Sequence, residues 1–303
     1  MKYLRDPCGS GIAIISLLLA IYILPGASLA ETRVIDDTGQ VLELERPARR
    51  IVSLAPHLAE LLFNAGAGEY VVGVSGFSDY PPAARAITRI GSGAGLDLER
   101  IVALQPDLVL AWQSGNPAGQ VERLRELGLR VFYSEPRVLE DIGETLARLG
   151  ELAGTQPQAQ QAVDSFTRRL SMLRQRHAGK APVSVFYQAW DRPLMTVNDA
   201  HIISDVIRLC GGVNVFAGLD ALAPQVGIES VLQRDPQVII AAADGPGSGD
   251  VLADWRRWPT LSAVRNDHLY TIPADLLVRH TPRILDGAEH VCGILDEVRI
   301  STM

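Results

Sequence analysis

The sequence predicts an α/β protein of two lobes, each with a mainly parallel sheet, joined by one long α-helix. Short apolar strands alternate with helical patterns, which is typical of parallel sheets covered on both faces. The alternation ends near residue 154 and restarts near residue 184, and an uninterrupted helical pattern lies between. We therefore divide the chain into a signal peptide (1–30), an N-terminal lobe (31–154), a connecting helix (155–179) and a C-terminal lobe (180–303).

The first 30 residues have the features of a secretory signal peptide. Lys2 and Arg5 precede an uncharged run over 12–24, and Ser-Leu-Ala at 28–30 supplies small residues for a signal peptidase. The run is shorter than the roughly 20 residues that a helix needs to span a bilayer. We therefore expect an exported, soluble chain.

The N-terminal lobe is expected to begin with a hairpin and to continue as strand–helix units. Residues 33–45 are predicted to form two strands around Asp37-Thr38-Gly39, which favours a turn. Further apolar strands are predicted at 51–54, 71–75, 108–112 and 131–134. Helices are predicted over about 56–65, from Asp97, and after Asn116-Pro117.

The connecting helix is predicted over 157–177. Apolar residues recur there at helical spacing, with no glycine inside, at 159, 163, 166, 170 and 173. Pro157 suits a first turn, and Gly179 suits the residue after the end. About 21 residues at 1.5 Å each span roughly 31 Å, enough to link two lobes. The alternative is one more covering helix on a single large sheet.

The C-terminal lobe is predicted to repeat the same strand–helix alternation. Strands are expected at 184–188, 238–242 and 269–273, with a final helix from about Pro282. One unit occurs in both lobes: LERIVALQPDLVLAW (98–112) has the same pattern as IESVLQRDPQVIIAA (228–242). Each copy predicts a short helix, a proline break and a buried strand.

Two cysteines follow the signal peptide, Cys210 and Cys292. In an exported chain such a pair more often forms a disulfide than a metal site. We therefore expect the two to be bridged.

Charge and motifs argue against several functions. The net charge is −7 without a Lys/Arg-rich run, so nucleic acid and anionic membranes are not expected partners. Glycine-rich stretches at 91–95 and 245–249 lack the spacing of nucleotide-binding loops. No nucleophile elbow occurs, and Ser53 and His57 have no evident third partner. Four scattered histidines leave zinc or manganese capture as an alternative. These observations favour binding over catalysis.

Three aromatic residues are predicted at or just after strand ends: Tyr80, Trp112 and Trp190. In doubly wound sheets ligands bind beyond the carboxyl ends of the strands. Aromatic side chains from both lobes could therefore line a cleft for a large flat ligand. Core packing of each ring is the alternative.

Five stretches resemble the periplasmic cobalamin-binding proteins that serve ABC importers: SLAPHLAELLFNAGAG, VVGVSGFSDYPP, LDLERIVALQPDLVLAW, LCGG and TPRI. The similarity runs from about Arg50 to Arg299. It implies two Rossmann-like lobes joined by a single long helix, with the ligand in the cleft, and a location in the periplasm. The wider class also captures haem and iron–siderophores.

The resemblance implies ligand-binding residues in both lobes. Tyr80 and Trp112 match pocket aromatics of the first lobe. Asp275 and Arg279 match polar pocket residues of the second lobe. Gln188 matches a strand-end position that faces the cleft.

The sequence departs from the family pattern at several positions. Ala189 stands where an aromatic residue is expected, with Trp190 beside it, and Gly93 and Ala223 replace two pocket tryptophans. His280 is an additional candidate for an axial ligand, which would suit haem or a corrinoid without its own base. A polar residue of the cleft is the alternative.

A glutamate leads each copy of the repeated unit, Glu99 in the first and Glu229 in the second. A carboxylate near a helix N-terminus contributes only about 0.3–1 kcal/mol and needs no further role. Two similar lobes would, however, display one glutamate each to a two-fold symmetric permease, whose arginines could pair with both. In the family that the chain resembles, these positions dock to the transporter.

We therefore expect a monomeric binding protein, without a cofactor, that carries cobalamin or a related corrinoid to an inner-membrane ABC permease dimer. A haem or iron–siderophore receptor is the alternative within the same fold. An exported α/β hydrolase is the alternative from another class.

Overall fold

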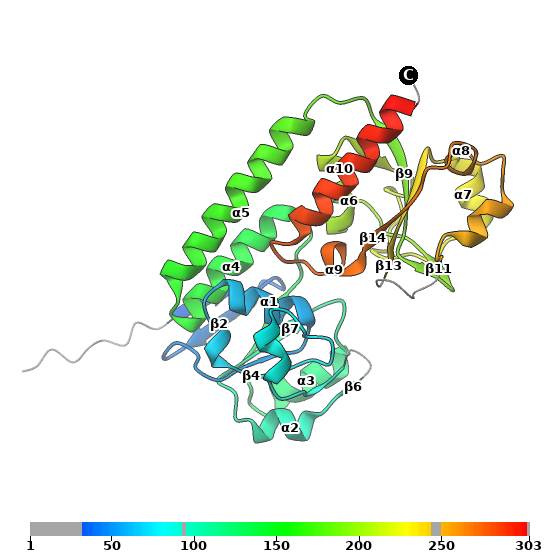
Figure 1. The fold of residues 1–303 in the computed structure, drawn as a ribbon. Helices are drawn as coiled ribbons and strands as arrows, with labels where there is room; N and C mark the ends of the chain where they lie inside the picture. Colours follow the sequence, from blue (N-terminus) through cyan, green and yellow to red (C-terminus); the bar gives the residue numbers. More distant parts are fainter. Residues whose placement is uncertain (1–31, 93–94, 244–249, 302–303) are drawn as a thin grey trace, which may run out of the picture.

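The structure is a computed structural model that describes residues 32–92, 95–243 and 250–301. The predicted signal peptide, Gly93 and the stretch 245–249 lie outside these residues. Figure 1 shows two α/β lobes with the long helix α5 (Gln156–His177) running along one side of both. The predicted fold class is confirmed.

The N-terminal lobe contains an antiparallel hairpin and a four-stranded parallel sheet. The sheet has the order β4-β3-β7-β8. The strands are β1 (Thr32–Ile35) and β2 (Val41–Leu44) of the hairpin, then β3 (Ile51–Ser53), β4 (Val71–Val74), β7 (Leu108–Trp112) and β8 (Val131–Ser134). The helices are α1 (Pro56–Asn64), α2 (Leu98–Ala103), α3 (Ala118–Glu126) and α4 (Leu139–Ala153), and a short pair β5 (Gly91–Ser92) and β6 (Gly95–Leu96) precedes α2.

The C-terminal lobe contains a second four-stranded parallel sheet, in the order β12-β9-β13-β14. Its strands are β9 (Val183–Gln188), β12 (Gly212–Asn214), β13 (Val238–Ala243) and β14 (Leu269–Pro273), with a small hairpin of β10 (Trp190–Asp191) and β11 (Leu194–Met195). Its helices are α6 (Ile202–Leu209), α7 (Ile228–Arg234), α8 (Ser262–Arg265), α9 (Ala274–Leu277) and α10 (Ile284–Ser301). Short 3-10 turns at 68–70, 82–86 and 253–257 complete the two lobes.

The repeated unit occupies the same position in both sheets. In each copy a short helix leads into the third strand of its sheet, β7 or β13, and that strand has neighbours on both sides. The apolar runs are almost completely buried, as expected for parallel strands covered on both faces. The residue before each proline, Gln105 or Asp235, has a positive φ (46° and 41°), which ends the helix and redirects the chain into the strand.

A buried ion pair links the two lobes near α5. Glu60 of α1 is fully buried and accepts two hydrogen bonds from the Arg283 guanidinium, at 2.8 and 2.7 Å. Thr281 donates a third, at 2.7 Å. Glu60 belongs to the first lobe, whereas Thr281 and Arg283 precede α10 in the second. The carboxylate is thus satisfied only when the lobes are together, since a buried charge without partners is costly.

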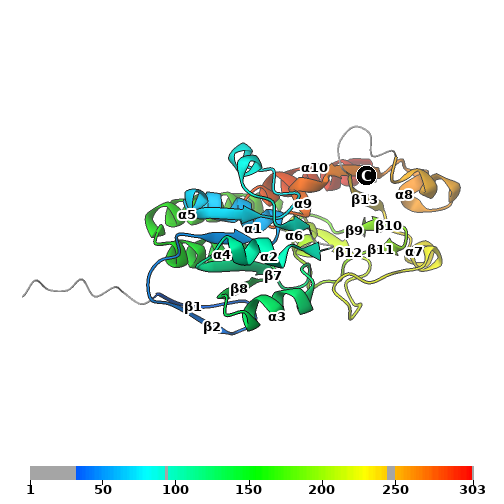
Figure 2. The ribbon, with the colours of Figure 1, turned by 90° about the horizontal axis from the view of Figure 1, so that it is seen from below.

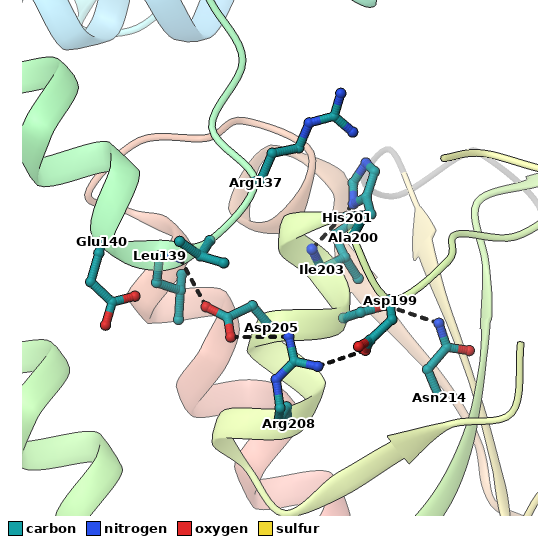
Figure 3. A network of polar contacts seen from close by, with 12 residues as sticks. Arg137, Leu139, Glu140, Asp199, Ala200, His201, Ile203, Asp205, Arg208 and Asn214 are labelled. Atoms are coloured by element: carbon teal, nitrogen blue, oxygen red, sulfur yellow. Dashed lines mark hydrogen bonds and ion pairs between the residues drawn. The ribbon is translucent and has the colours of Figure 1, made fainter. Parts of the chain in front are cut away.

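A second polar link joins the lobes at the start of α4. Asp205 of α6 accepts a hydrogen bond from the backbone N–H of Leu139, at 2.9 Å, and so caps a helix of the other lobe. Figure 3 shows this contact together with Arg208, which pairs with both Asp205 and Asp199. The same view places Arg137 close to His201 at the start of α6.

The structure pairs Cys210 with Cys292 in a disulfide, as the sequence predicts. The bridge ties the end of α6 to α10 and closes a sequence separation of 82 residues. Both sulfur-bearing side chains are buried in the C-terminal lobe. Within the described residues, no helix combines the length and the hydropathy that crossing a membrane requires.

Candidate ligand-binding site

A cleft of about 790 Å³ lies between the lobes, within the range of small-molecule sites. The first lobe lines it with residues from the start of α1, the 76–80 loop and the end of β7: Pro56, His57, Phe77, Asp79 and Trp112. The second lobe lines it with residues from the ends of β13 and β14 and from α9: Ala243, Pro273, Ala274, Asp275, Val278 and Arg279. These elements sit at the carboxyl ends of parallel strands, where doubly wound sheets bind ligands. Figure 2 shows the same two lobes from below.

Trp112 is held at the end of β7 by the loop that follows it. The Asn116 side chain accepts the Trp112 backbone N–H at 2.7 Å and donates to the Leu54 carbonyl at 3.0 Å. Gly115 lies against the indole so closely that a Cβ there would come within 1.9 Å of the ring. The ring is therefore fixed in the cleft wall and leaves space only for glycine behind it.

Arg279 is the charged residue that crosses the cleft. The residue is 8% exposed, and its guanidinium pairs with Asp275 of its own lobe at 2.8 Å. It also reaches Asp79 of the other lobe at 2.7 Å and donates to the Phe77 carbonyl at 3.3 Å. Partial burial opposes ionisation of Asp79, but the hydrogen bond and charge of Arg279 outweigh it and lower the pKa of Asp79. The cleft thus holds Arg279 in contact with both Asp79 and Asp275, beside an aromatic wall.

Tyr80 adjoins the cleft but is not among the described residues that line it. Its ring packs under the Arg283 guanidinium, 3.8 Å from the carbon to the ring centroid. Arg283 is the same residue that pairs with buried Glu60. Tyr80 is 41% exposed, so one part of its ring is free for contact while the other part joins the link between the lobes.

The structure does not bring Gln188 and Trp190 into this cleft. The Gln188 amide donates to the Val251 carbonyl at 3.0 Å and accepts from the Trp255 indole at 2.7 Å. It lines a second, smaller pocket of about 150 Å³ within the C-terminal lobe. Trp190 lies on the β10–β11 hairpin, 61% exposed, with its indole N–H on the Arg192 carbonyl. The position of Gln188 and Trp190 near a strand end in the sequence suggested the cleft, but it could not show that both side chains are hydrogen-bonded within the C-terminal lobe.

Sequence reasoning did not assign His57, Phe77 and Asp79 to the cleft. Phe77 and Asp79 belong to the same GFSDYPP segment as Tyr80, so the position of this segment after a strand could have predicted that they line the cleft. Ser53 donates its hydroxyl to the Ala55 carbonyl at 2.8 Å and is fully buried. Its hydroxyl is thus bound to the backbone near His57, which leaves no arrangement for nucleophilic catalysis there.

Three histidines and Trp112 pack together at the floor of the cleft, where the lobes meet. His57 lies 5.1 Å from Trp112 and 5.4 Å from His280, measured between ring centroids. His280 is in turn 5.9 Å from Trp112 and 5.8 Å from His201. Burial, with Arg279 nearby, lowers the pKa of His57 to about 3. Burial, with Arg137 nearby, lowers the pKa of His201 to about 4, and the pKa of His280 is also well below its usual value, mainly through burial. The cluster is therefore neutral at neutral pH.

The two lobes, the long helix α5 that links them and the cleft between them are accompanied by a sequence match to a known protein family. The match covers most of the chain. Residues 51–276 match the periplasmic binding protein family. The chain belongs to this family. Membership, together with the relatives below, confirms the resemblance that the sequence motifs indicated and identifies a substrate-binding protein rather than an enzyme.

The relatives within the family include several vitamin B12-binding proteins. The chain is 40% identical to that of Vibrio cholerae over 259 residues, which cover 85% of this chain and 93% of the relative. The crystal structure of the periplasmic vitamin B12-binding protein of Vibrio cholerae matches with a TM-score of 0.77 at 39% identity, over 84% of this chain and 98% of that one. A periplasmic haem-binding protein from Roseiflexus matches with a TM-score of 0.72 at 21% identity, covering 83% and 99%, which is a likeness of fold.

Proposed function

We propose that the protein captures cobalamin or a related corrinoid in the interlobe cleft and delivers it in the periplasm to an inner-membrane ABC permease dimer. The observation that carries the proposal is the cleft of about 790 Å³ at the carboxyl ends of both sheets, in a chain 40% identical to a vitamin B12-binding protein. The carrier acts as a monomer, because each lobe supplies one wall of the same cleft.

The cleft chemistry suits a broad macrocycle with amide side chains. Trp112 offers an aromatic face, and Phe77, 73% exposed on the 76–80 loop of the same lobe, offers a second. Asp79, Asp275 and Arg279 supply acceptors and donors for peripheral amides, which a polar ligand needs when it leaves water. We assign direct ligand contact to Trp112, Asp275 and Arg279.

The remaining predicted ligand contacts have different roles in this proposal. Tyr80 contacts the ligand from the edge of the cleft, with Arg283 stacked on its other side. Trp190 is exposed on its hairpin and does not line the cleft, so in this proposal it contacts only a part of the ligand that extends beyond the cleft. Gln188 acts indirectly, because its amide holds Val251 and Trp255. Ala223 is exposed and has no aromatic face to add.

Docking is assigned to Glu99 and Glu229. Both are exposed in the first turns of α2 and α7, and neither has an ion-pair partner among the described residues. Figure 1 shows α2 and α7 on separate lobes, both away from α5. Two unpaired carboxylates, one on each lobe, fit two arginines presented by a symmetric permease.

The ligand class is tested by calorimetric titration of the purified mature protein with cyanocobalamin, aquacobinamide and ferric haem in parallel. We expect saturable one-to-one binding of the corrinoids. Saturable binding of haem with no heat from either corrinoid would replace the proposal by a haem receptor. Hydrolysis of simple esters by the same preparation would instead favour an enzyme.

A further inference from the structure

A small pocket, which we call the α7 pocket, lies in the C-terminal lobe beside helix α7. Its volume is about 150 Å³. It is formed by the end of β9, the β10–β11 hairpin, the first residue of α7 and the turn at 250–255. The lining residues are Gln188, Asp191, Arg192, Leu194, Ile228, Asp250, Val251, Ala253, Asp254 and Trp255. Among the described residues, none lines both this pocket and the interlobe cleft, so the two are separate sites.

Hydrogen bonds hold the segments around the α7 pocket in place. The hairpin is joined to the segment that leads into α7, because the Val226 N–H donates to the Leu194 carbonyl at 3.0 Å. The Gln188 side chain holds the turn: it donates to the Val251 carbonyl at 3.0 Å and accepts the Trp255 indole N–H at 2.7 Å. A pocket that is already fixed in shape costs little conformational entropy when a partner enters it.

The buried part of the lining is mainly apolar, and the exposed part is charged. Trp255 is buried, and Leu194 and Val251 pack against the core of the lobe. Arg192 and Asp254, both exposed, form an ion pair between the hairpin and the turn, at 3.3 Å. Apolar walls with a polar edge are typical of the pockets that receive an anchor side chain at a protein interface.

The two lobes differ at this place. In the C-terminal lobe the hairpin is inserted after β9, whereas in the N-terminal lobe α1 starts at Pro56, soon after the equivalent strand β3 ends at Ser53. Leu98, which corresponds to Ile228 in the repeated unit, packs against the core of its lobe. Ile228 is instead 40% exposed and lines the pocket. The C-terminal lobe therefore has an apolar surface at the start of α7 that the repeated unit does not require.

The size and the position of the α7 pocket indicate what it holds. Sites for small molecules measure about 300–1,000 Å³, a range that includes the interlobe cleft but not a pocket of about 150 Å³. The smaller volume suits a single side chain. Ile228 is followed directly by Glu229, the carboxylate assigned to docking. A protein that pairs with Glu229 therefore comes next to the pocket.

We propose that the α7 pocket receives one apolar side chain from a periplasmic loop of the permease. The inference rests on the proposed docking through Glu99 and Glu229, and it adds a second kind of contact to the same interface. The glutamate contacts weaken as salt rises, because exposed charges are screened. Burial of an apolar side chain is not screened in this way, so the C-terminal lobe keeps its anchor at high salt.

Ala253→Trp tests the inference by filling the pocket. Ala253 lines the pocket and is exposed, so a larger side chain there reduces the space without entering the core. The affinity of the protein for the transporter in nanodiscs should fall by at least about tenfold, which is the effect of losing one buried aliphatic side chain. Ala181→Trp is the matched control. Ala181 is exposed just before β9 starts, whereas the pocket lies where β9 ends, so this variant should dock normally.

Ile228→Ala provides a second test that adds no bulk. It removes an apolar wall of the pocket, and docking should weaken severalfold by the same amount at low and at high salt. Val213→Ala is the control, because Val213 is an exposed apolar residue of β12 in the same lobe. Glu229→Ala should differ from Ile228→Ala in that its effect shrinks as salt rises. Thermal unfolding of each variant shows whether it is folded.

Normal docking by folded Ala253→Trp or by folded Ile228→Ala overturns the inference. Two other results would also overturn it by assigning the pocket another occupant. Loss of cyanocobalamin affinity in Ala253→Trp with normal docking would make the pocket part of the ligand site. A wild-type dimer in sedimentation that Ala253→Trp dissociates would make the occupant a second copy of this chain.

Failure of the inference is distinguishable from failure of the proposed function. Cyanocobalamin titration of the wild type tests ligand capture, whatever occupies the α7 pocket. If Glu99→Ala with Glu229→Ala docks normally, the proposed docking surface fails together with the pocket. If that double variant loses docking while Ala253→Trp and Ile228→Ala retain it, the glutamates keep their role and the pocket has none.

Discussion

The two copies of the repeated unit are alike at their outer ends and differ at the cleft. Both begin with a glutamate in the first helical turn, and both redirect the chain through a positive-φ residue before a proline. In the first lobe the strand β7 ends at Trp112, whereas the residue that corresponds to Trp112 in the second copy is Ala242, one residue before the end of β13. The end of β7 and the end of β13 both reach the cleft, which is lined by Trp112 and Ala243. Under the proposed function, the two glutamates would face a symmetric permease, while the differing strand ends would face one asymmetric ligand.

Side chains tie each copy to its sheet in an equivalent way. Asp107 accepts the backbone N–H groups of Arg49 and Arg50, at 2.8 and 3.0 Å, just before β3. Gln237, its counterpart, accepts the backbone N–H of Ser184 in β9, at 2.9 Å. The carboxylate of Asp107 and the amide of Gln237 thus have the same structural role, because each offers an oxygen that accepts a backbone N–H of the neighbouring strand segment.

The largest expected effect is a loss of transport when the glutamate that the two copies of the repeated unit share is removed from both. The double variant Glu99→Ala with Glu229→Ala is expected to abolish uptake in vesicles that contain the transporter, because in the proposed docking the two carboxylates fix the orientation of the carrier. Cleft affinity should stay near the wild-type value. Glu69→Ala, which removes another exposed glutamate of the first lobe, serves as the control. Normal uptake by the double variant would show that the glutamates have no role in docking. Their only effect would then be the local interaction with the helix dipole.

The second largest expected effect is a loss of ligand affinity when Trp112, which only the first copy of the repeated unit has, is removed. Trp112→Ala should weaken corrinoid binding by at least about tenfold, because a buried aromatic face contributes a few kcal/mol. Cobalamin should also quench tryptophan fluorescence less in this variant than in the wild type. Calorimetry measures the affinity, and Trp112→Phe should keep most of it. Unchanged affinity in Trp112→Ala would mean that the ligand lies elsewhere.

Gly115→Ala tests whether the placement of the ring matters as well as its presence. A Cβ at Gly115 would come within 1.9 Å of the Trp112 ring and must displace it. We expect affinity to fall severalfold, somewhat less than in Trp112→Ala. Gly119→Ala is the matched control, since a Cβ there meets nothing within 4 Å, and it should bind normally. Equal affinities of the two glycine variants would show that the ring can move without consequence.

The smallest effect concerns a local difference between the two helices. Asp97 caps α2 by accepting the Arg100 backbone N–H at 2.9 Å, whereas Gly227 gives α7 no side-chain cap. Asp97→Ala should therefore lower the free energy of unfolding by about 1 kcal/mol. Urea denaturation of the mature protein measures this loss. Gly227→Ala should cost less, because no side-chain cap is removed, and a larger loss there would contradict the comparison.

The sequence by itself determined the order of the elements. Helical spacing and apolar runs predicted the strut and most strands, because periodicity reflects burial on one or both faces. The repeated motif predicted two similar lobes, and the export signal with two cysteines predicted the Cys210–Cys292 disulfide. Tyr80, Trp112, Asp275 and Arg279 came from motifs of a family.

Only the tertiary structure decided which side chains share the cleft. Arg279 and Phe77 are 202 positions apart in sequence, yet they are hydrogen-bonded across the lobes. His57 and His280 meet in the same way, from two different lobes. Gln188, at a strand end that suggested the cleft, instead faces Val251 and Trp255. Local patterns fix which face of an element is buried, whereas contacts between distant elements depend on how the two lobes are set against each other.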